Sequence, residues 1–374
     1  MPWKVCDQMS VRDEFVRLLQ AGNLSKSELC RRYGISRRTG YKWLKRYESE
    51  GREGLSDQSR RPRNSPSKTS GELEEAVLSL REAHPEWGGR KLRRRLQDLG
   101  HEGVPSASTI TEILRRYGRL REPERATRHF QRFEHEEPND LWQMDFKGHF
   151  ATGSGRRCHP LTVLDDHSRF SLCLRALDCE RGEQVQQELI AIFLRYGMPR
   201  AMLMDNGPPW GDEAGSQTRW TVWLMRQGIR VTHGRAYHPQ TQGKEERFHR
   251  TLKAEVLQGR EFADLPECQR RFDVWREVYN HERPHESLGL SVPASRFRAS
   301  EREYQEHPAA WEYSPGTEVR KVDSSGKYSF RGRRYKAGKP YVGQELGLRA
   351  EEADGVWSVW FCRTRVQQID LRAG

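Results

Sequence analysis

Three acidic residues stand in local patterns that could support chemistry on phosphodiesters. Asp145 lies in the segment 141–150, where polar and apolar residues alternate as in a half-buried strand. Asp205 ends a short apolar run, and strand ends followed by loops are where α/β proteins place their chemistry. Glu246 lies at the start of a charged helix that follows Gly243. Taken singly, each acid is more often an ordinary edge, turn or surface carboxylate, so only their combination is informative.

The charged helix has a predicted buried stripe and a charged flank. Phe248, Leu252 and Val256 repeat every four residues, which marks the side that packs against the rest of the protein. Glu245 begins on that stripe because it lies three residues before Phe248. Glu246 falls on the flank, where a carboxylate beside a row of bases suits a metal ligand facing a phosphodiester. The bases of that row are His249, Arg250 and Lys253.

Together the three patterns, WxxD, DNG and YHPQTQGKxER, resemble those of the DDE transposase and retroviral-type integrase superfamily. The resemblance is to the insertion-sequence transposases that have an integrase-type catalytic core. It implies an RNase H-like fold for this core and a catalytic, metal-binding triad of Asp145, Asp205 and Glu246. The gaps are 205 − 145 = 60 and 246 − 205 = 41 positions. The second gap is a few residues longer than these families usually show, which predicts a small insertion within 208–218.

Three carboxylates are hard oxygen ligands, the set that Mg²⁺ or Mn²⁺ prefers. Two ions about 4 Å apart could bridge a scissile phosphate, one activating the nucleophile and one stabilising the leaving 3′ oxygen. We expect Asp145 to bridge both ions, Asp205 to hold one and Glu246 the other. The nucleophile would be water during end cleavage and a DNA 3′-hydroxyl during strand transfer, as in a polynucleotidyl transferase and DNA endonuclease. His238 and Gln242 are expected to line the site.

Two other function classes stay open at this point. One is a DNA-binding regulator derived from a transposase, whose core no longer cuts; the presence of all three carboxylates argues against it. The other is a structure-selective nuclease of the same fold that hydrolyses DNA without joining it. Two DNA-binding modules before the core and a basic segment after it favour the joining enzyme. A synapse of two element ends would require a homodimer or homotetramer on DNA.

The composition favours a polyanionic partner, which we take to be double-stranded DNA. Of 374 residues, 65 are Lys or Arg and 53 are Asp or Glu, giving a formal charge of +12. The chain has no apolar run long enough to span a membrane and no apolar signal core at its start, so a cytoplasmic place on bacterial chromosomal or plasmid DNA is expected. Its seven cysteines form no CxxC pair, which predicts reduced thiols and no zinc site.

Before the core, residues 1–50 and 71–118 each predict three short helices with glycine or proline breaks, the pattern of a helix-turn-helix module. The second pattern resembles the second such module of the same transposases. A basic linker, 51–70, and a charged linker, 119–137, follow the two modules. Gly40, inside a predicted helix, either permits close approach to DNA or is a neutral choice. The residues predicted to cap helices are Ser10, Ser25 and Ser36 in the first module, and Ser106 or Ser108 in the second.

The core, 138–300, predicts three consecutive strands followed by alternating helices and strands, which indicates α/β layering. Asp165 and Asp166 fall between two of these strands, where turn chemistry is a better interpretation than metal binding. The last domain, 315–374, is predicted to be a small all-β barrel like that of Src-homology-3 domains. Its five expected strands are 319–322, 327–330, 333–336, 345–349 and 356–362.

Basic side chains in all of these parts are candidate DNA contacts. Those of the predicted helix-turn-helix modules would contact a major groove, and those of the linker would contact a phosphate backbone or a minor groove. Those of the core and the last domain would contact phosphates. The candidates are Arg37, Arg38, Thr39, Lys42, Arg60, Arg61, Arg63, Arg90, Lys91, Lys244, Arg247, Arg250, Lys253, Arg333 and Arg334.

Overall fold

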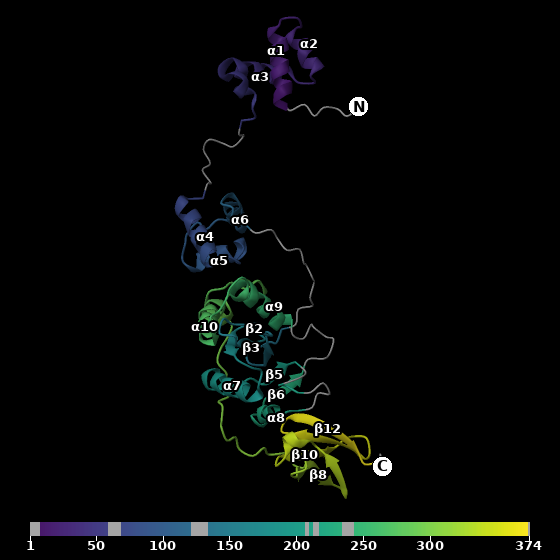
Figure 1. The fold of residues 1–374 in the computed structure, drawn as a ribbon. Coiled ribbons are helices and arrows are strands. Elements are labelled where there is room, and N and C mark those ends of the chain that lie inside the picture. Colours follow the sequence, from purple (N-terminus) through teal and green to yellow (C-terminus); the bar gives the residue numbers. More distant parts are fainter. Residues whose placement is uncertain are drawn as a thin grey trace. The chain divides into compact units, whose positions relative to one another are not determined.

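The computed structural model of the chain divides into two compact units, residues 1–68 and 69–374 (Figure 1). It describes residues 8–58, 69–120, 134–205, 209–211, 217–233 and 243–372. None of the helices in these ranges combines the length and the apolar character that crossing a membrane requires.

The first unit is a three-helix module, as predicted. Ser25 and Ser36 cap the second and third helices, since their side chains accept hydrogen bonds from the backbone N–H groups of Glu28 at 3.3 Å and Thr39 at 3.2 Å. The predicted cap at Ser10 is wrong, because the first helix begins two residues earlier and Ser10 lies inside it. The helices are α1 (Gln8–Gln20), α2 (Lys26–Arg32), α3 (Arg37–Glu50) and the 3₁₀ turn η1 (Gly51–Leu55).

Gly40 of α3 is buried for a reason that neither sequence interpretation included. A Cβ atom built on Gly40 would lie 2.7 Å from the sulfur of Cys30 and 3.1 Å from the ring of Phe15. Gly40 therefore lets α1, α2 and α3 pack closely within the module. Its role is internal packing rather than approach to DNA.

The second unit begins with another three-helix module. Ser106, not Ser108, caps the last helix, accepting from the Thr109 N–H at 3.1 Å. Its core is built on Val77, Trp87 and other apolar side chains, all nearly inaccessible to solvent. The helices are α4 (Gly71–Ala83), α5 (Gly89–Asp98) and α6 (Ala107–Arg116).

A mixed sheet forms the centre of the predicted core domain, in the order β4-β3-β1-β5-β6 with β2 also paired to β3. β1, β3 and β4 run antiparallel, whereas β1, β5 and β6 run parallel. This confirms the predicted α/β layering. The strands are β1 (Leu141–Phe146), β2 (Phe150–Ala151), β3 (Arg157–Asp165), β4 (Ser171–Leu177), β5 (Ala201–Met204) and β6 (Arg230–His233).

Helices cover both faces of this sheet (Figure 1). One face packs on α7 and α8, and the other on α9, its π-helical continuation η3, and α10. Phe248, Leu252 and Val256 are buried on the second face, which confirms the predicted stripe. The helices are α7 (Gly182–Tyr196), α8 (Arg219–Arg226), α9 (Gly243–Leu252), η3 (Lys253–Leu257) and α10 (Leu265–His281), followed by the turns η4 (Glu286–Leu288) and η5 (Pro293–Ser295).

The strand that carries Asp145 differs from its prediction in two ways. It ends at Phe146, so Lys147 and His149 lie beyond it. Its polar face is not open to solvent either, since Gln143 on that face is only 2% exposed. The expected half-buried strand is thus buried on both faces through most of its length, because α9 covers the side that carries Asp145.

The last domain is antiparallel β structure, as predicted, but it has six strands in the described residues instead of five. The missed strand is β12, whose polar and charged residues gave no apolar alternation. One sheet has the order β12-β11-β10-β7 and the other pairs β8 with β9. The strands are β7 (Glu318–Lys321), β8 (Lys327–Phe330), β9 (Arg333–Lys336), β10 (Glu345–Ala350), β11 (Val356–Phe361) and β12 (Thr364–Asp370), with the 3₁₀ turn η6 (Lys339–Tyr341).

Candidate active site

Asp145 and Asp205 meet at the ends of two paired strands. β1 and β5 pair in parallel with Leu141 opposite Ala201 and Gln143 opposite Leu203. Continuing that register places Asp145 level with Asp205, which directly follows β5. Because parallel strands end at the same edge of a sheet, both carboxylates lie at one edge.

Asp145 is in an environment that disfavours its charged form. Its side chain is 23% exposed. Burial, and second the negative charge of Asp205, raise the pKa of Asp145 to about 7. One of its oxygens accepts the N–H of Phe146 at 2.8 Å, which favours the charged form but does not outweigh burial. Ionised Asp145 therefore needs a nearby positive charge.

Three side chains converge behind Asp145 on the face covered by α9. The Thr162 hydroxyl lies 3.0 Å from the backbone oxygen of Asp145, 3.1 Å from Oε2 of Glu245 and 2.8 Å from Nε2 of His249. A single hydroxyl proton cannot serve both oxygens fully, so this cluster is satisfied when His249 or a protonated Glu245 donates to the Thr162 oxygen. His249 Nδ1 also lies 3.8 Å from a carboxylate oxygen of Asp145.

Burial favours the neutral forms of Glu245 and His249. It raises the pKa of Glu245 well above its ordinary value, and the charge of Asp145 adds to the shift. Burial, with a smaller contribution from Lys147, lowers the pKa of His249 to about 3. Placing His249 beside Glu246 in the row of bases on the helix flank was wrong, because His249 is buried and faces the sheet. Glu245, in contrast, occupies the buried stripe as predicted.

Glu246, the next residue of α9, is exposed. No group of three His, Cys, Asp or Glu side chains within the described ranges is close enough to hold a metal ion. The structure thus brings Asp145 and Asp205 together, and Glu246 is an exposed residue of α9. His238, Gln242 and the expected insertion within 208–218 lie wholly or partly outside the described residues.

Asp165 takes part in the turn after β3, as predicted, whereas Asp166 makes its side-chain contacts with segments outside that turn. Asp165 accepts hydrogen bonds from the N–H of Asn139 at 2.7 Å and the N–H of Ser168 at 2.8 Å. Asp166 is fully buried and accepts from the side-chain amide of Gln143 at 2.7 Å. It also forms an ion pair with Lys244, described further below.

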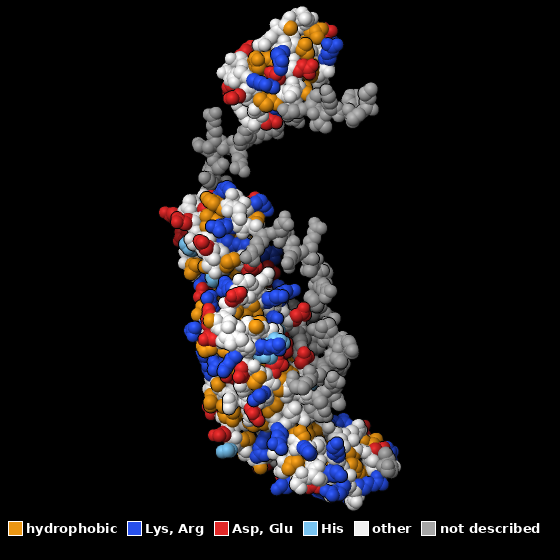
Figure 2. Space-filling view, viewed as in Figure 1, with side chains coloured by type: hydrophobic (Ala, Val, Ile, Leu, Met, Phe, Trp, Pro, Cys, Tyr) orange, Lys and Arg blue, Asp and Glu red, His pale blue; other side chains and the backbone are white. Residues whose placement is uncertain are grey.

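The candidate DNA contacts differ in exposure. On α3, Arg37, Arg38 and Lys42 are exposed, while the Thr39 hydroxyl is 2.8 Å from that of Ser36. Arg60, Arg61 and Arg63 lie outside the described residues. Figure 2 shows lysine and arginine side chains spread over the visible face of the last domain. The other exposed candidates are Arg90, Arg247, Arg250, Lys253, Arg333 and Arg334.

Several of these candidates also have partners within the protein. Lys91 is half-buried, and burial, followed by the charge of Arg283, lowers its pKa to about 8. Arg334 pairs with Asp323, and Arg333 donates to a backbone oxygen at 3.0 Å.

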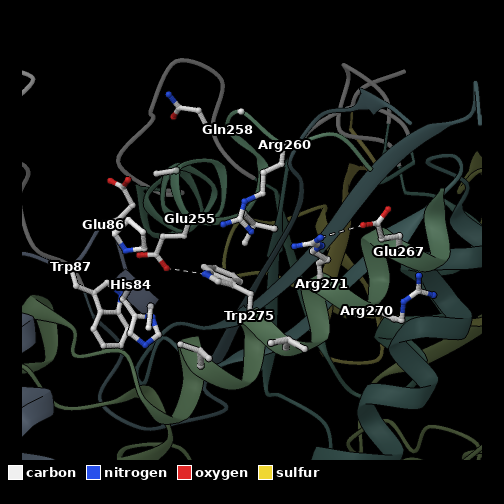
Figure 3. A pocket seen from close by; sticks show the side chains of 17 residues that line it. His84, Glu86, Trp87, Glu255, Gln258, Arg260, Glu267, Arg270, Arg271 and Trp275 are labelled. Atoms are coloured by element: carbon white, nitrogen blue, oxygen red, sulfur yellow. Dashed lines mark hydrogen bonds and ion pairs between the residues drawn. The ribbon is translucent and has the colours of Figure 1, made fainter. Parts of the chain in front are cut away.

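A cavity of about 710 Å³ lies away from Asp145, between the α4–α5 turn and η3 with α10 (Figure 3). Trp275 on its wall donates to Glu255 at 2.8 Å. The charged side chains of its lining are balanced, so it lacks the positive field that a DNA strand would favour. They are Glu86, Glu255, Glu267, Arg260, Arg270 and Arg271.

Sequence reasoning missed Thr162 as a site residue, and it did not predict that His249 is buried. Thr162 is a polar residue within the apolar run of β3. Because buried polar groups are usually hydrogen-bonded, this position could have predicted a buried hydrogen-bond partner. Its partners come from β1 and α9, far apart in sequence, so only the folded structure identifies them.

Family models match this chain along most of its length. An "IS481 family transposase, C-terminal domain" model matches residues 317–374. Two "Integrase core domain" models match 135–239 and 227–293. A "Homeodomain-like domain" matches 39–114 and a "Helix-turn-helix domain" matches 11–63.

Two curated relatives come from bacterial insertion elements. The chain is 28% identical to the "Insertion element IS476 uncharacterized 39.2 kDa protein" of Xanthomonas euvesicatoria, over 82% of this chain and 81% of that protein. It is 29% identical to the "Insertion element IS407 uncharacterized 31.7 kDa protein" of Burkholderia multivorans, over 47% of this chain and 61% of that protein.

Two solved structures with some similarity to this chain are of viral proteins. A chain of a simian T-cell lymphotropic virus intasome, in complex with PP2A regulatory subunit B56 gamma, is 16% identical with a TM-score of 0.38, covering 79% of this chain and 96% of that one. The catalytic core domain of BIV integrase is 24% identical with a TM-score of 0.32, covering 42% of this chain and 92% of that one.

Proposed function

We propose that this chain is an insertion-sequence transposase, similar to the IS481 family, which binds the terminal inverted repeats of its element, cleaves the DNA at the 3′ ends and joins them to target DNA. The observation that carries this proposal is the meeting of Asp145 and Asp205 at one edge of the sheet. Two acids held level at the ends of parallel strands, one of them with a raised pKa, are typical of a reaction site rather than of a structural ion pair.

We further propose Asp145, Asp205 and Glu246 as ligands of two divalent cations, Mg²⁺ or Mn²⁺. The donor set fits: all three groups are carboxylates, and the charged form of Asp145 is destabilised by burial and by Asp205. When bound, such cations polarise the scissile phosphate and lower the pKa of a coordinated water or hydroxyl. Glu246 supplies the third carboxylate from α9, which packs against the face of β1 that carries Asp145.

The chain's own residues then bind and orient DNA. The exposed side chains of Arg247, Arg250 and Lys253 follow Glu246 along α9 and η3, where they hold the phosphates of the element end. The first module offers Arg37 and Arg38 at the start of α3 to a major groove. The repeats at the two ends of an element are brought together by a homodimer or homotetramer on DNA.

The direct test is an end-joining assay with the full-length protein. The probes are a labelled duplex carrying the inverted repeat that flanks the coding region, a target plasmid and Mg²⁺. The wild type should cleave and join the duplex, whereas Glu246→Gln should do neither. Glu261→Gln, which changes an exposed glutamate in the loop after η3, is the matched control and should act as wild type.

The outcomes separate the competing functions. Cleavage without joining would identify a nuclease. Tight binding of the duplex with neither cleavage nor joining, by wild type and variant alike, would identify a DNA-binding regulator. Full activity of Glu246→Gln would remove Glu246 from the proposed triad.

A further inference from the structure

Lys244 is held by the protein rather than extended to solvent. Its side chain is 16% exposed, its ammonium pairs with the fully buried carboxylate of Asp166, and it donates to the backbone oxygen of Asp166 at 3.2 Å. That carboxylate is itself held by Gln143 of β1 at 2.7 Å and by the N–H of His135 at 2.9 Å. The first turn of α9 is thereby tied to the β3–β4 turn and, through Gln143, to β1.

Thr162 ties the following residues of α9 to the same strand. It lies directly opposite Asp145 in the β1–β3 register, and its hydroxyl is 3.0 Å from the Asp145 backbone oxygen. The same hydroxyl contacts Glu245 at 3.1 Å and His249 at 2.8 Å. One threonine oxygen therefore links the strand that carries Asp145 to two successive turns of α9.

Glu246 lies in the chain between the α9 residues that make these two ties, Lys244–Asp166 and Thr162–Glu245–His249. Lys244 precedes it by two residues, and Glu245 and His249 lie on either side of it in the chain. A helix turns about 100° per residue, so fixing these side chains fixes the direction in which Glu246 leaves α9. Both ties are buried or half-buried, which makes them stronger and less screened than surface contacts.

We propose that Thr162 and Lys244 are positioning residues, which hold α9 against β1 so that Glu246 reaches the edge where Asp145 and Asp205 lie, and that Lys244 is not a phosphate contact. The proposal rests on the proposed function, since it takes Glu246 to be a metal ligand. It reverses the sequence-based expectation for Lys244 and leaves DNA binding to the exposed cations farther along the helix.

The test removes each tie with little change in shape, in the full-length protein. Thr162→Val removes the hydroxyl and keeps the volume, whereas Thr162→Ser keeps the hydroxyl. Lys244→Met removes the charge, whereas Lys244→Arg keeps it. The matched control is Thr251→Val, because the Thr251 hydroxyl donates only within α9, to the backbone oxygen of Arg247 at 2.9 Å.

Three quantities are measured for each variant: Mn²⁺ binding without DNA by electron paramagnetic resonance, affinity for the labelled duplex in EDTA over a series of salt concentrations, and end joining. Thr162→Val and Lys244→Met should weaken Mn²⁺ binding and slow joining about 10- to 100-fold, the usual effect of losing an outer-shell partner. Thr162→Ser, Lys244→Arg and Thr251→Val should stay close to wild type. Duplex affinity and its salt dependence should not change in any variant.

Two results would overturn the proposal. If Lys244→Met weakens duplex binding and lowers the salt slope by about 1 with Mn²⁺ binding intact, Lys244 is a phosphate contact. If Thr162→Val matches Thr251→Val in Mn²⁺ binding, the Thr162 tie does not position the ligands. Should Thr162→Val fail to fold, the Lys244 pair still decides the question.

Failure of the proposed function looks different. If the wild type binds Mn²⁺ but does not join DNA, the transposase proposal fails, while the Mn²⁺ comparison among variants still tests the positioning roles. If Glu246→Gln leaves Mn²⁺ binding of the wild type unchanged, the ligand assignment fails whatever the variants of Thr162 and Lys244 show.

Discussion

At the scale of single residues, Glu245 and Glu246 show that neighbours in sequence can have opposite environments. Their positions on the stripe and the flank of one helix were predictable from the spacing to Phe248. What faces each of them was not, because the partner of Glu245 is Thr162, 83 positions earlier. Sequence patterns identify which side of an element a residue occupies, whereas the contact that gives it a role depends on elements brought together by the whole fold.

Proton binding to Asp145 should compete with metal binding. Because the pKa of Asp145 without metal is about 7, the carboxyl is mostly protonated below pH 7 and must lose its proton to bind a cation. Mn²⁺ affinity should therefore fall about tenfold for each pH unit below 7 and level off above it, since one proton is released. Titrations of Mn²⁺ across this range, followed by electron paramagnetic resonance, measure the dependence.

Asp145→Asn provides the comparison for that titration. It should bind Mn²⁺ weakly and lose the dependence near pH 7. An unchanged pH profile in Asp145→Asn would show that another group controls metal binding.

At the scale of elements, helices were predicted well because period and caps agree, as at Ser25 and Ser36. The errors have physical causes. The cap at Ser10 was wrong because a serine can also occupy a helix interior. β12 was missed because its neighbour β11 and the turns, rather than its own apolar content, define it as a strand. The packing of α9 over β1 is a tertiary contact, and no local sequence pattern predicts it.

Gly40→Ala tests packing within the first module. The added methyl must displace the Cys30 sulfur or the Phe15 ring, which costs about 1–3 kcal/mol, while alanine gains about 1 kcal/mol in helix propensity. The net effect should be a lower free energy of unfolding of this module. Faster hydrogen exchange in peptides from α1 to α3 of the full-length protein would reveal it.

Gly71→Ala is the control, since nothing lies within 4 Å of a Cβ at Gly71. It should leave exchange in α1 to α3 unchanged. A Gly40→Ala variant with wild-type exchange would mean that the three helices separate easily enough to accept a methyl group.

At the scale of the whole molecule, the order of the parts was predictable: two helical modules, an α/β core and a β domain follow one another along the chain. The resemblance of a few motifs to those of a known superfamily predicted the fold of the core, and the basic composition indicated DNA as a partner. The basic, proline- and serine-rich segment between the two helical modules carries no packing pattern in its sequence.

The net charge of +12 should make DNA binding strongly dependent on salt. Replacing Arg37 and Arg38 by alanine should lower the slope of log affinity against log salt by about 2, if each neutralises one phosphate. Fluorescence anisotropy of a labelled duplex measures this slope. Arg195→Ala, which removes an exposed charge from α7, should leave it unchanged, and an equal loss in both variants would show that α3 has no special place in binding.

The parallel register of β1 and β5 also determines which changes in chain length this protein can accept. Asp145 and Asp205 are level because Gln143 lies opposite Leu203, whatever the length of chain between them. Residues added in the loops after β2 or β4 would lengthen the gap and keep the two acids together. One residue added inside β1 would turn every later side chain of that strand to its opposite face and move Asp145 into the apolar layer under α7. Among distant relatives, strand register is therefore a safer guide to this pair of acids than the number of residues that separates them.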